Sequence, residues 1–80
     1  MSETLDQVWI AFSEDTGVLG TAADLDLGKQ IVEDYLLSRN GDQVAGWRRE
    51  SSVWSTTGRQ WAARFYVEAF HVRRHRSASS

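Results

Sequence analysis

The stretch from Arg59 to Val72 constrains the fold more than any other part of the chain. It is the longest apolar-rich run, and its residues alternate in character. The odd-numbered positions carry Trp61, Ala63, Phe65, Val67 and Ala69, and the even-numbered positions carry Gln60, Ala62, Arg64, Tyr66 and Glu68. A period of two with aromatic and β-branched residues predicts a half-buried strand whose odd-numbered side chains face the core.

A helix is the competing interpretation of the same stretch. Trp61, Phe65 and Ala69 also recur at four-residue steps, as the members of an amphipathic helix do. The strand is preferred because the preceding residues supply a hairpin partner for it. The segment from Gly46 to Trp54 is followed by Thr56-Thr57-Gly58, a three-residue loop with glycine at the left-handed position.

This hairpin has a self-consistent register. It pairs Ser55 with Arg59, Val53 with Trp61 and Trp47 with Val67 on the core face, and sets Glu50 opposite Arg64 and Arg48 opposite Tyr66 on the other. A slip of one residue would exchange the two faces. Arg49 fits poorly, because it falls on the core side. It can pair with a helix carboxylate, mark the sheet edge, or follow a bulge within residues 48–52.

The N-terminal half predicts a second strand pair and a helix. In the strand Val8–Phe12, one face holds Val8, Ile10 and Phe12 and the other holds Trp9 and Ala11; a turn over residues 13–17 and a short returning strand over residues 18–20 follow. The helix is expected over residues 22–38, and its apolar face consists of Leu25, Gly28, Ile31, Val32, Tyr35 and Leu36.

The ends of this helix carry recognisable signals. Thr21 with Asp24 predicts a capping box at the start, and Asp26 is the alternative N-cap. Asn40-Gly41 predicts the C-terminal stop. Gly28 costs a helix about 1 kcal/mol relative to alanine, so we expect it to serve a close approach of helix and sheet.

The resulting order of strand, strand, helix, strand, strand predicts one α+β domain over residues 1–80. It consists of a small, mostly antiparallel sheet with one helix packed on one face. The ordered core is expected over residues 8–72, with flexible ends at residues 1–7 and 73–80. A chain of this length buries only about 60% of its unfolded surface, so its stability is expected to be modest unless it dimerises.

The chain resembles short strand–strand–helix–strand domains of uncharacterised phage and actinobacterial proteins. The residues that carry the resemblance are Val8–Phe12, Gly17–Gly20, the helix start at Thr21 and the late aromatic strand. The resemblance implies a fold and a link to mobile elements, and it assigns no site residues.

Composition narrows the class of protein. There is no cysteine, the apolar and charged fractions are 41% and 25%, and no apolar run reaches the roughly 20 residues that span a bilayer. The N-terminal residues MSETLDQ are polar and acidic, unlike a signal peptide. We therefore expect a soluble, cytoplasmic protein with no membrane partner.

The residues give little support to catalysis. There is no cysteine nucleophile and no Gly-rich phosphate loop. His71 and His75 have metal-ligand spacing, but the neighbouring arginines would repel a divalent cation. The acidic pairs at residues 14–15 and 33–34 are expected to be solvated surface. We predict that the chain is not an enzyme and uses no metal, cofactor or small-molecule substrate.

Charge is unevenly distributed along the chain. Residues 1–42 hold nine acidic and two basic side chains, whereas residues 43–80 hold two acidic and seven basic ones. Attraction between the two halves of one domain explains this pattern. A basic surface that meets an anionic partner also explains it.

A single helix covers one face of the sheet, so the other face is the predicted binding surface. In the register above it carries Trp9, Arg48, Trp54, Arg64 and Tyr66. Burial of these rings by neighbouring side chains is the simplest explanation for them. Two functions compete with it. The first is binding to another protein or to a second copy of the chain, since Trp, Tyr and Arg dominate interface hot spots. The second is nucleic-acid binding by the same face, with Arg73, Arg74 and Arg76 as additional phosphate contacts.

Overall fold

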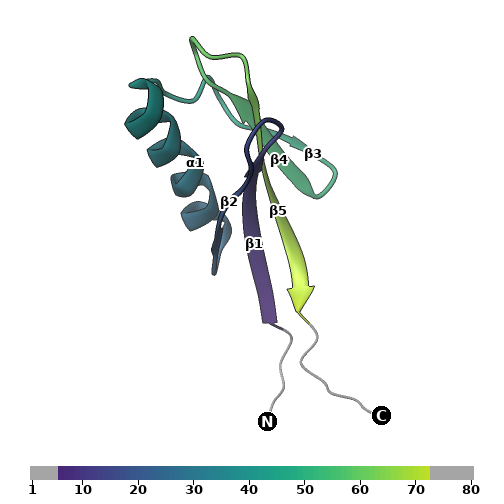
Figure 1. Cartoon of the computed structure of the whole chain (residues 1–80). Helices are drawn as coiled ribbons and strands as arrows, with labels where there is room; N and C mark the ends of the chain where they lie inside the picture. The colour runs from purple at the N-terminus through teal and green to yellow at the C-terminus, as the bar shows by residue number, and fades with distance from the viewer. Residues whose placement is uncertain (1–5, 73–80) are drawn as a thin grey trace, which may run out of the picture.

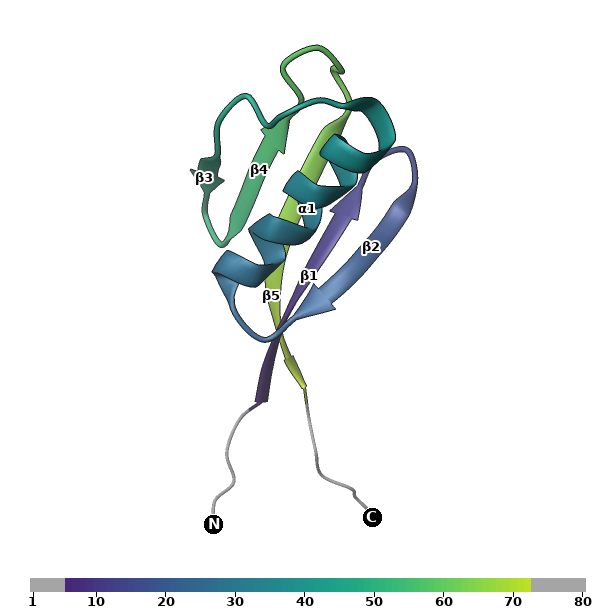
Figure 2. The same cartoon turned by 90° about the vertical axis from the view of Figure 1, so that its left-hand side faces the viewer.

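The computed structural model describes residues 6–72, which form one antiparallel sheet of five strands with a single helix on one face (Figure 1). The elements are β1 (Asp6–Ser13), β2 (Gly17–Ala22), α1 (Leu25–Asn40), β3 (Arg48–Glu50), β4 (Val53–Thr57) and β5 (Arg64–Val72). Their order across the sheet is β2-β1-β5-β4-β3, and α1 lies in front of the sheet in Figure 2. The predicted α+β class with one helix on one face is confirmed. The predicted flexible residues 73–80, with Arg73, Arg74 and Arg76, lie outside the described residues, as do residues 1–5.

The hairpin of β1 and β2 closes on a polar turn, as the sequence predicted. The Ser13 hydroxyl oxygen accepts the backbone N–H of Asp15 at 3.1 Å and that of Thr16 at 3.3 Å. Gly17 follows with φ +91°, a conformation that L side chains rarely adopt. The register shifts after Ala11, so that Leu19 is an extra residue in β2 and packs toward the core.

Helix α1 begins and ends on its own capping residues. Asp24 is the N-cap, and its Oδ1 accepts the Leu27 N–H at 2.9 Å. The predicted N-cap Thr21 is wrong, because residues 21 and 22 pair within β2. The alternative N-cap Asp26 is also wrong, because it lies inside the first turn of the helix. The predicted stop is confirmed: Gly41 has φ +62° and donates its N–H to the Leu37 carbonyl at 2.9 Å.

The core forms where the apolar face of α1 meets β1 and β5. Its fully buried members are Ala11, Val32, Leu36, Phe65 and Val67. Gly28 lies at the closest approach, because a Cβ on this residue would sit 2.7 Å from Cγ1 of Val67. The predicted helix face and the predicted role of Gly28 are both confirmed. Phe65 and Val67, two odd-numbered residues of β5, face this core, also as predicted.

The predicted hairpin between residues 46–54 and β5 is wrong in its register. Residues 47–54 divide into β3 and β4 at a tight turn in which Ser51 has φ +60°. Thr56 and Thr57 belong to β4, and the connection to β5 is the loop 58–63. Val53 lies opposite Glu68 instead of Trp61, a shift of seven positions along the chain. Because seven is odd, the shift exchanges the two faces of β4.

Arg49 lies on the edge strand β3. It pairs with Trp54 in the sheet, its side chain is exposed, and its Nε donates to the Ser51 carbonyl at 3.0 Å. Of the three explanations for this residue, the sheet edge fits. The turn at Ser51 takes the place of the predicted bulge.

Candidate binding site on the uncovered sheet face

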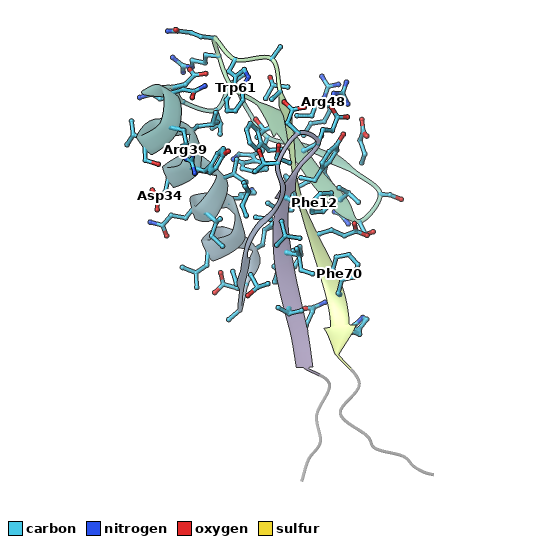
Figure 3. The ribbon with its side chains drawn as sticks, in the orientation of Figure 1. Phe12, Asp34, Arg39, Arg48, Trp61 and Phe70 are labelled. Carbon is cyan, nitrogen blue, oxygen red and sulfur yellow. The ribbon has the colours of Figure 1, made fainter. Side chains whose placement is uncertain are left out.

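The sheet face that points away from α1 is the candidate site, and it is called the open face below. Side chains alternate between the two faces of a strand, so the residues opposite the core positions define it. Its members are Val8, Ile10, Phe12, Val18, Thr21, Arg48, Glu50, Val53, Ser55, Thr57, Arg64, Tyr66, Glu68 and Phe70. In Figure 3, Phe12, Arg48 and Phe70 lie on the side of the sheet away from the helix.

Two predicted site residues, Trp9 and Trp54, do not belong to the open face. The Cβ of Trp9 lies 3.6 Å from the position that a Cβ on Gly28 would take. The Lys29 ammonium lies 4.0 Å from the centroid of the Trp54 ring, at cation–π distance. The predicted placement of both rings is wrong, because the small Gly28 gives Trp9 room beneath the helix and the register shift turns Trp54 inward.

The other two tryptophans also lie on the helix side. Trp47 Nε1 donates to Oε2 of Glu33 at 3.4 Å. The Trp61 ring stacks against Tyr35 with centroids 6.4 Å apart, and it meets Phe65 edge to face at 5.8 Å. All four tryptophans of the chain therefore pack around α1 and the core, where their large apolar area contributes to the stability of the small domain.

An apolar half of the open face lies over β1, β2 and β5. Phe12 and Tyr66 stack with ring centroids 5.2 Å apart and an interplanar angle of 27°. The Tyr66 hydroxyl donates to Oε2 of Glu14 at 3.1 Å, which fixes the ring. Val18 and Phe70 extend this surface and are 67% and 41% exposed. The sequence predicted Trp9 instead of Phe12 on this face of β1, so the predicted site included Tyr66 but missed its stacking partner Phe12.

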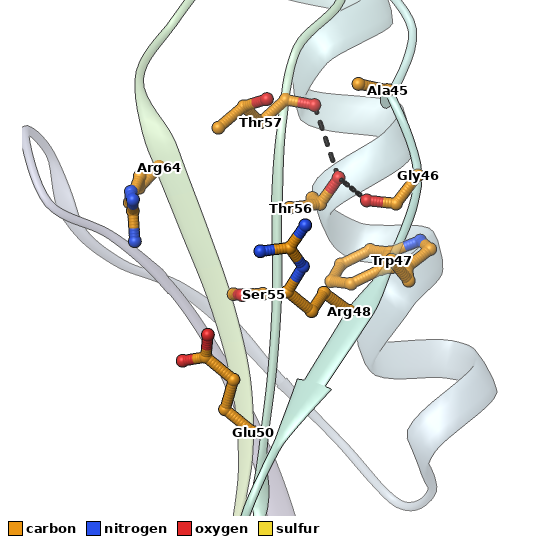
Figure 4. Close-up of a pocket in the computed structure, with 9 residues that line it drawn as sticks. All are labelled: Ala45, Gly46, Trp47, Arg48, Glu50, Ser55, Thr56, Thr57 and Arg64. Atoms are coloured by element: carbon orange, nitrogen blue, oxygen red, sulfur yellow. Dashed lines mark hydrogen bonds between the residues drawn. The ribbon is translucent and has the colours of Figure 1, made fainter.

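A polar half of the open face lies over β3, β4 and β5. Here a hollow of about 450 Å³ is open to solvent (Figure 4). It is lined by Ala45, Gly46, Trp47, Arg48, Glu50, Ser55, Thr56, Thr57 and Arg64. The buried Thr56 hydroxyl donates to the Gly46 carbonyl at 2.6 Å and so holds the segment before β3 against β4. The guanidinium groups of Arg48 and Arg64 and the carboxylate of Glu50 occupy the rim (Figure 4).

The three remaining predicted site residues, Arg48, Arg64 and Tyr66, do lie on the open face. The predicted direct pairs of Arg48 with Tyr66 and of Glu50 with Arg64 are wrong, because β4 separates β3 from β5. Arg48 pairs with Ser55, and Ser55 pairs with Tyr66, so the first and last of these share one row across three strands.

Charge on the open face is arranged in rows that cross the strands. One row contains Arg48, Ser55, Tyr66, Phe12 and Val18, and the next contains Glu50, Val53, Glu68, Ile10 and Thr21. The first row is cationic and the second is anionic. Both rows continue across β1 and β2 into the apolar half of the open face.

Asp42 is a buried carboxylate that holds the loop next to this site. It is 4% exposed, and its side chain accepts the N–H groups of Gln43 at 2.8 Å, Gln60 at 3.1 Å and Trp61 at 3.0 Å. Burial alone would raise the pKa of Asp42, but the backbone N–H groups of residues 43 and 59–61 outweigh it and lower the pKa below 3.8. Asp42 therefore acts as an ionised anchor for the loop that leads into β5.

Within residues 6–72 no cluster of three His, Asp or Glu side chains is arranged to hold a metal ion. The only helix of the described part is too short and too polar to cross a membrane. His71 is exposed at the end of β5, and His75, the other histidine of the metal-ligand spacing, lies beyond the described residues.

No protein-family model matches the chain, and comparisons with curated proteins and with solved structures give no match.

Proposed function

We propose that the chain is a small non-catalytic binding protein that acts through its open face by protein–protein interaction. The observation that supports this best is the stacked pair Phe12 and Tyr66, which continues into the exposed Val18 and Phe70 on a sheet face that no helix within residues 6–72 covers. Contiguous apolar surface on a small domain is typical of an interaction site. Tyr and Arg are enriched where such sites carry their binding energy.

The charges of the open face define the chemistry of its partner. Arg48 and Arg64 favour a carboxylate across the interface, and Glu50 and Glu68 favour a cation. The apolar half favours aliphatic or aromatic side chains. A protein surface that combines all three is the partner that fits, whereas a uniformly charged polymer fits only part of the face.

Site-specific photocrosslinking tests this proposal. A photoreactive residue is placed at Val18 on the open face, and as a matched control at Leu37, which is 58% exposed on the outer side of α1. In cells in which the gene is naturally expressed, position 18 is expected to give a protein adduct that position 37 does not give. The purified adduct partner should bind the wild-type chain and bind a Phe70→Ser variant at least about tenfold more weakly. Absence of an adduct at position 18, or the same adducts at both positions, would contradict the proposal.

Single-stranded nucleic acid is the second candidate. The row that holds Arg48, Tyr66 and Phe12 offers two rings for base stacking and a guanidinium for phosphate. The glutamates of the neighbouring row oppose a polyanion. Fluorescence anisotropy with labelled oligonucleotides at low salt distinguishes the two functions, because a nucleic-acid-binding protein should bind at about 10 µM or below. No binding at that concentration removes this candidate.

A further inference from the structure

The open face is complementary to itself, and we infer that it takes a second copy of this chain. The inference rests on the proposed function, because it names the partner for the same surface. Each copy offers the apolar half, the cationic row and the anionic row that a partner of this face must supply. The two sheets pack face to face, with the two α1 helices on the outside.

The symmetry of such a dimer follows from the two charged rows. A two-fold axis that runs across the strands, between the cationic and the anionic row, exchanges the two rows. Arg48 then lies opposite Glu50 of the second copy, and Glu50 lies opposite Arg48 of the second copy. On β1 the same operation sets Phe12 against Ile10 of the second copy. Opposite charges therefore meet at Arg48 and Glu50, and apolar groups meet at Phe12 and Ile10.

A two-fold axis along β5 is a second way to stack the sheets, and charge disfavours it. This axis leaves each residue of β5 opposite its own copy. Arg64 would face Arg64, and Glu68 would face Glu68. Like charges in direct opposition are destabilising, so the axis across the strands is the one that the residues select.

The available area makes this dimer a reversible one. Five strands spaced about 4.8 Å apart, over rows that span about 20 Å, give roughly 500 Å² for each copy. The total of roughly 1,000 Å² lies at the lower limit for specific interfaces. We therefore expect a dimer that dissociates on dilution.

Exchange of the two charges tests both the partner and the symmetry. Arg48→Glu and Glu50→Arg are made singly, and both positions are exposed, so the fold should tolerate them. Sedimentation velocity from about 1 µM to about 1 mM should show a monomer–dimer equilibrium for the wild-type chain, and self-association at least about tenfold weaker for each variant. An equimolar mixture of the two variants should associate as tightly as the wild type, because each acidic side chain then meets a basic one.

A control and two contrary outcomes complete the test. Arg59→Glu makes the same charge change in the exposed loop before β5 and should leave association unchanged. A wild-type chain that stays monomeric over the whole range overturns the inference. So does a mixture that associates no better than the single variants. The proposed function survives either result if position 18 crosslinks to a different protein, and it fails as well if position 18 crosslinks to nothing.

Discussion

The carboxylate of Asp42 accepts the backbone N–H of Trp61 at 3.0 Å, which joins the second residue after α1 to the loop before β5. This contact bridges residues that are 19 positions apart. It keeps Gln60 and Trp61 in a loop, although their side chains continue the alternation of β5. Strand β5 consequently begins at Arg64, and β4 pairs with it in the observed register. The composition of the open face depends on that register.

The pH dependence of stability should reveal the role of Asp42. The pKa of Asp42 in the folded protein lies below its ordinary value of 3.8, so the ionised form stabilises the fold. This stabilisation is fully present above pH 3.8 and is lost as the pH falls through the lower, folded-state pKa. Thermal melts of the wild type and of Asp42→Asn should differ at neutral pH, with the variant melting lower, and converge in acid. If the difference in melting temperature between the wild type and the variant stays constant down to pH 2, this assignment is contradicted.

Gly28 should resist substitution despite its position inside a helix. Alanine gains about 1 kcal/mol in helix propensity over glycine. At this site, however, the added Cβ meets Val67 at 2.7 Å, and overpacking of a core costs about 1–3 kcal/mol. Gly28→Ala should therefore lower the free energy of unfolding in urea. The double variant with Val67→Ala should lose less than the sum of the two single changes, and strict additivity would refute the contact.

Val18 should matter for association and not for folding. Val18→Thr preserves the shape of the side chain and its β-branching, so the free energy of unfolding should change by no more than about 0.5 kcal/mol. The control Phe65→Ala empties part of the core and should cost about 3–5 kcal/mol. Sedimentation of Val18→Thr should show weaker self-association at unchanged thermal stability. A large loss of stability would show that Val18 belongs to the core.

Lys29 should contribute to the stability of the fold through its contacts with two tryptophan rings. Its ammonium lies 4.0 Å from the Trp54 centroid and 5.6 Å from that of Trp47. Lys29→Met keeps an apolar stem and removes the charge, so the free energy of unfolding should fall by about 0.5–1 kcal/mol. The change should be smaller in a Trp54→Leu background, where only the more distant contact with Trp47 remains. An equal loss in both backgrounds would assign the effect to another contact.

Local sequence signals identified the stop of α1, its apolar face and the alternation along β5, because each depends on residues close together in the chain. Asn40 and Gly41 stop α1 because glycine takes the left-handed conformation at low cost. The apolar positions of α1 recur at helical steps, and Phe65 and Val67 alternate with Arg64 and Tyr66 along β5. These patterns predicted the α+β class, the helix face and the even-numbered β5 residues of the open face. They also predicted that Arg48 and Arg64 are available to a partner.

These local signals could not predict which face of β1 and which face of β4 points toward the helix. In β1 both faces are apolar, so alternation cannot tell whether Trp9 or Phe12 faces the helix. The close approach at Gly28 decides it, because Trp9 fits beneath the helix there. In β4, Trp54 turns inward since the loop anchored by Asp42 shifts the register by an odd number of residues.

By itself, the sequence determined the α+β class, the place of the helix in the chain and that one helix must leave a sheet face uncovered, since periodicity and capping are properties of neighbouring residues. Only the tertiary structure decided which side chains occupy that uncovered face. Contacts such as those of Asp42 with the loop before β5 and of Gly28 with Val67 join residues far apart in the chain. An alternating pattern is compatible with either set of side chains facing the helix, so these long-range contacts decide which set does.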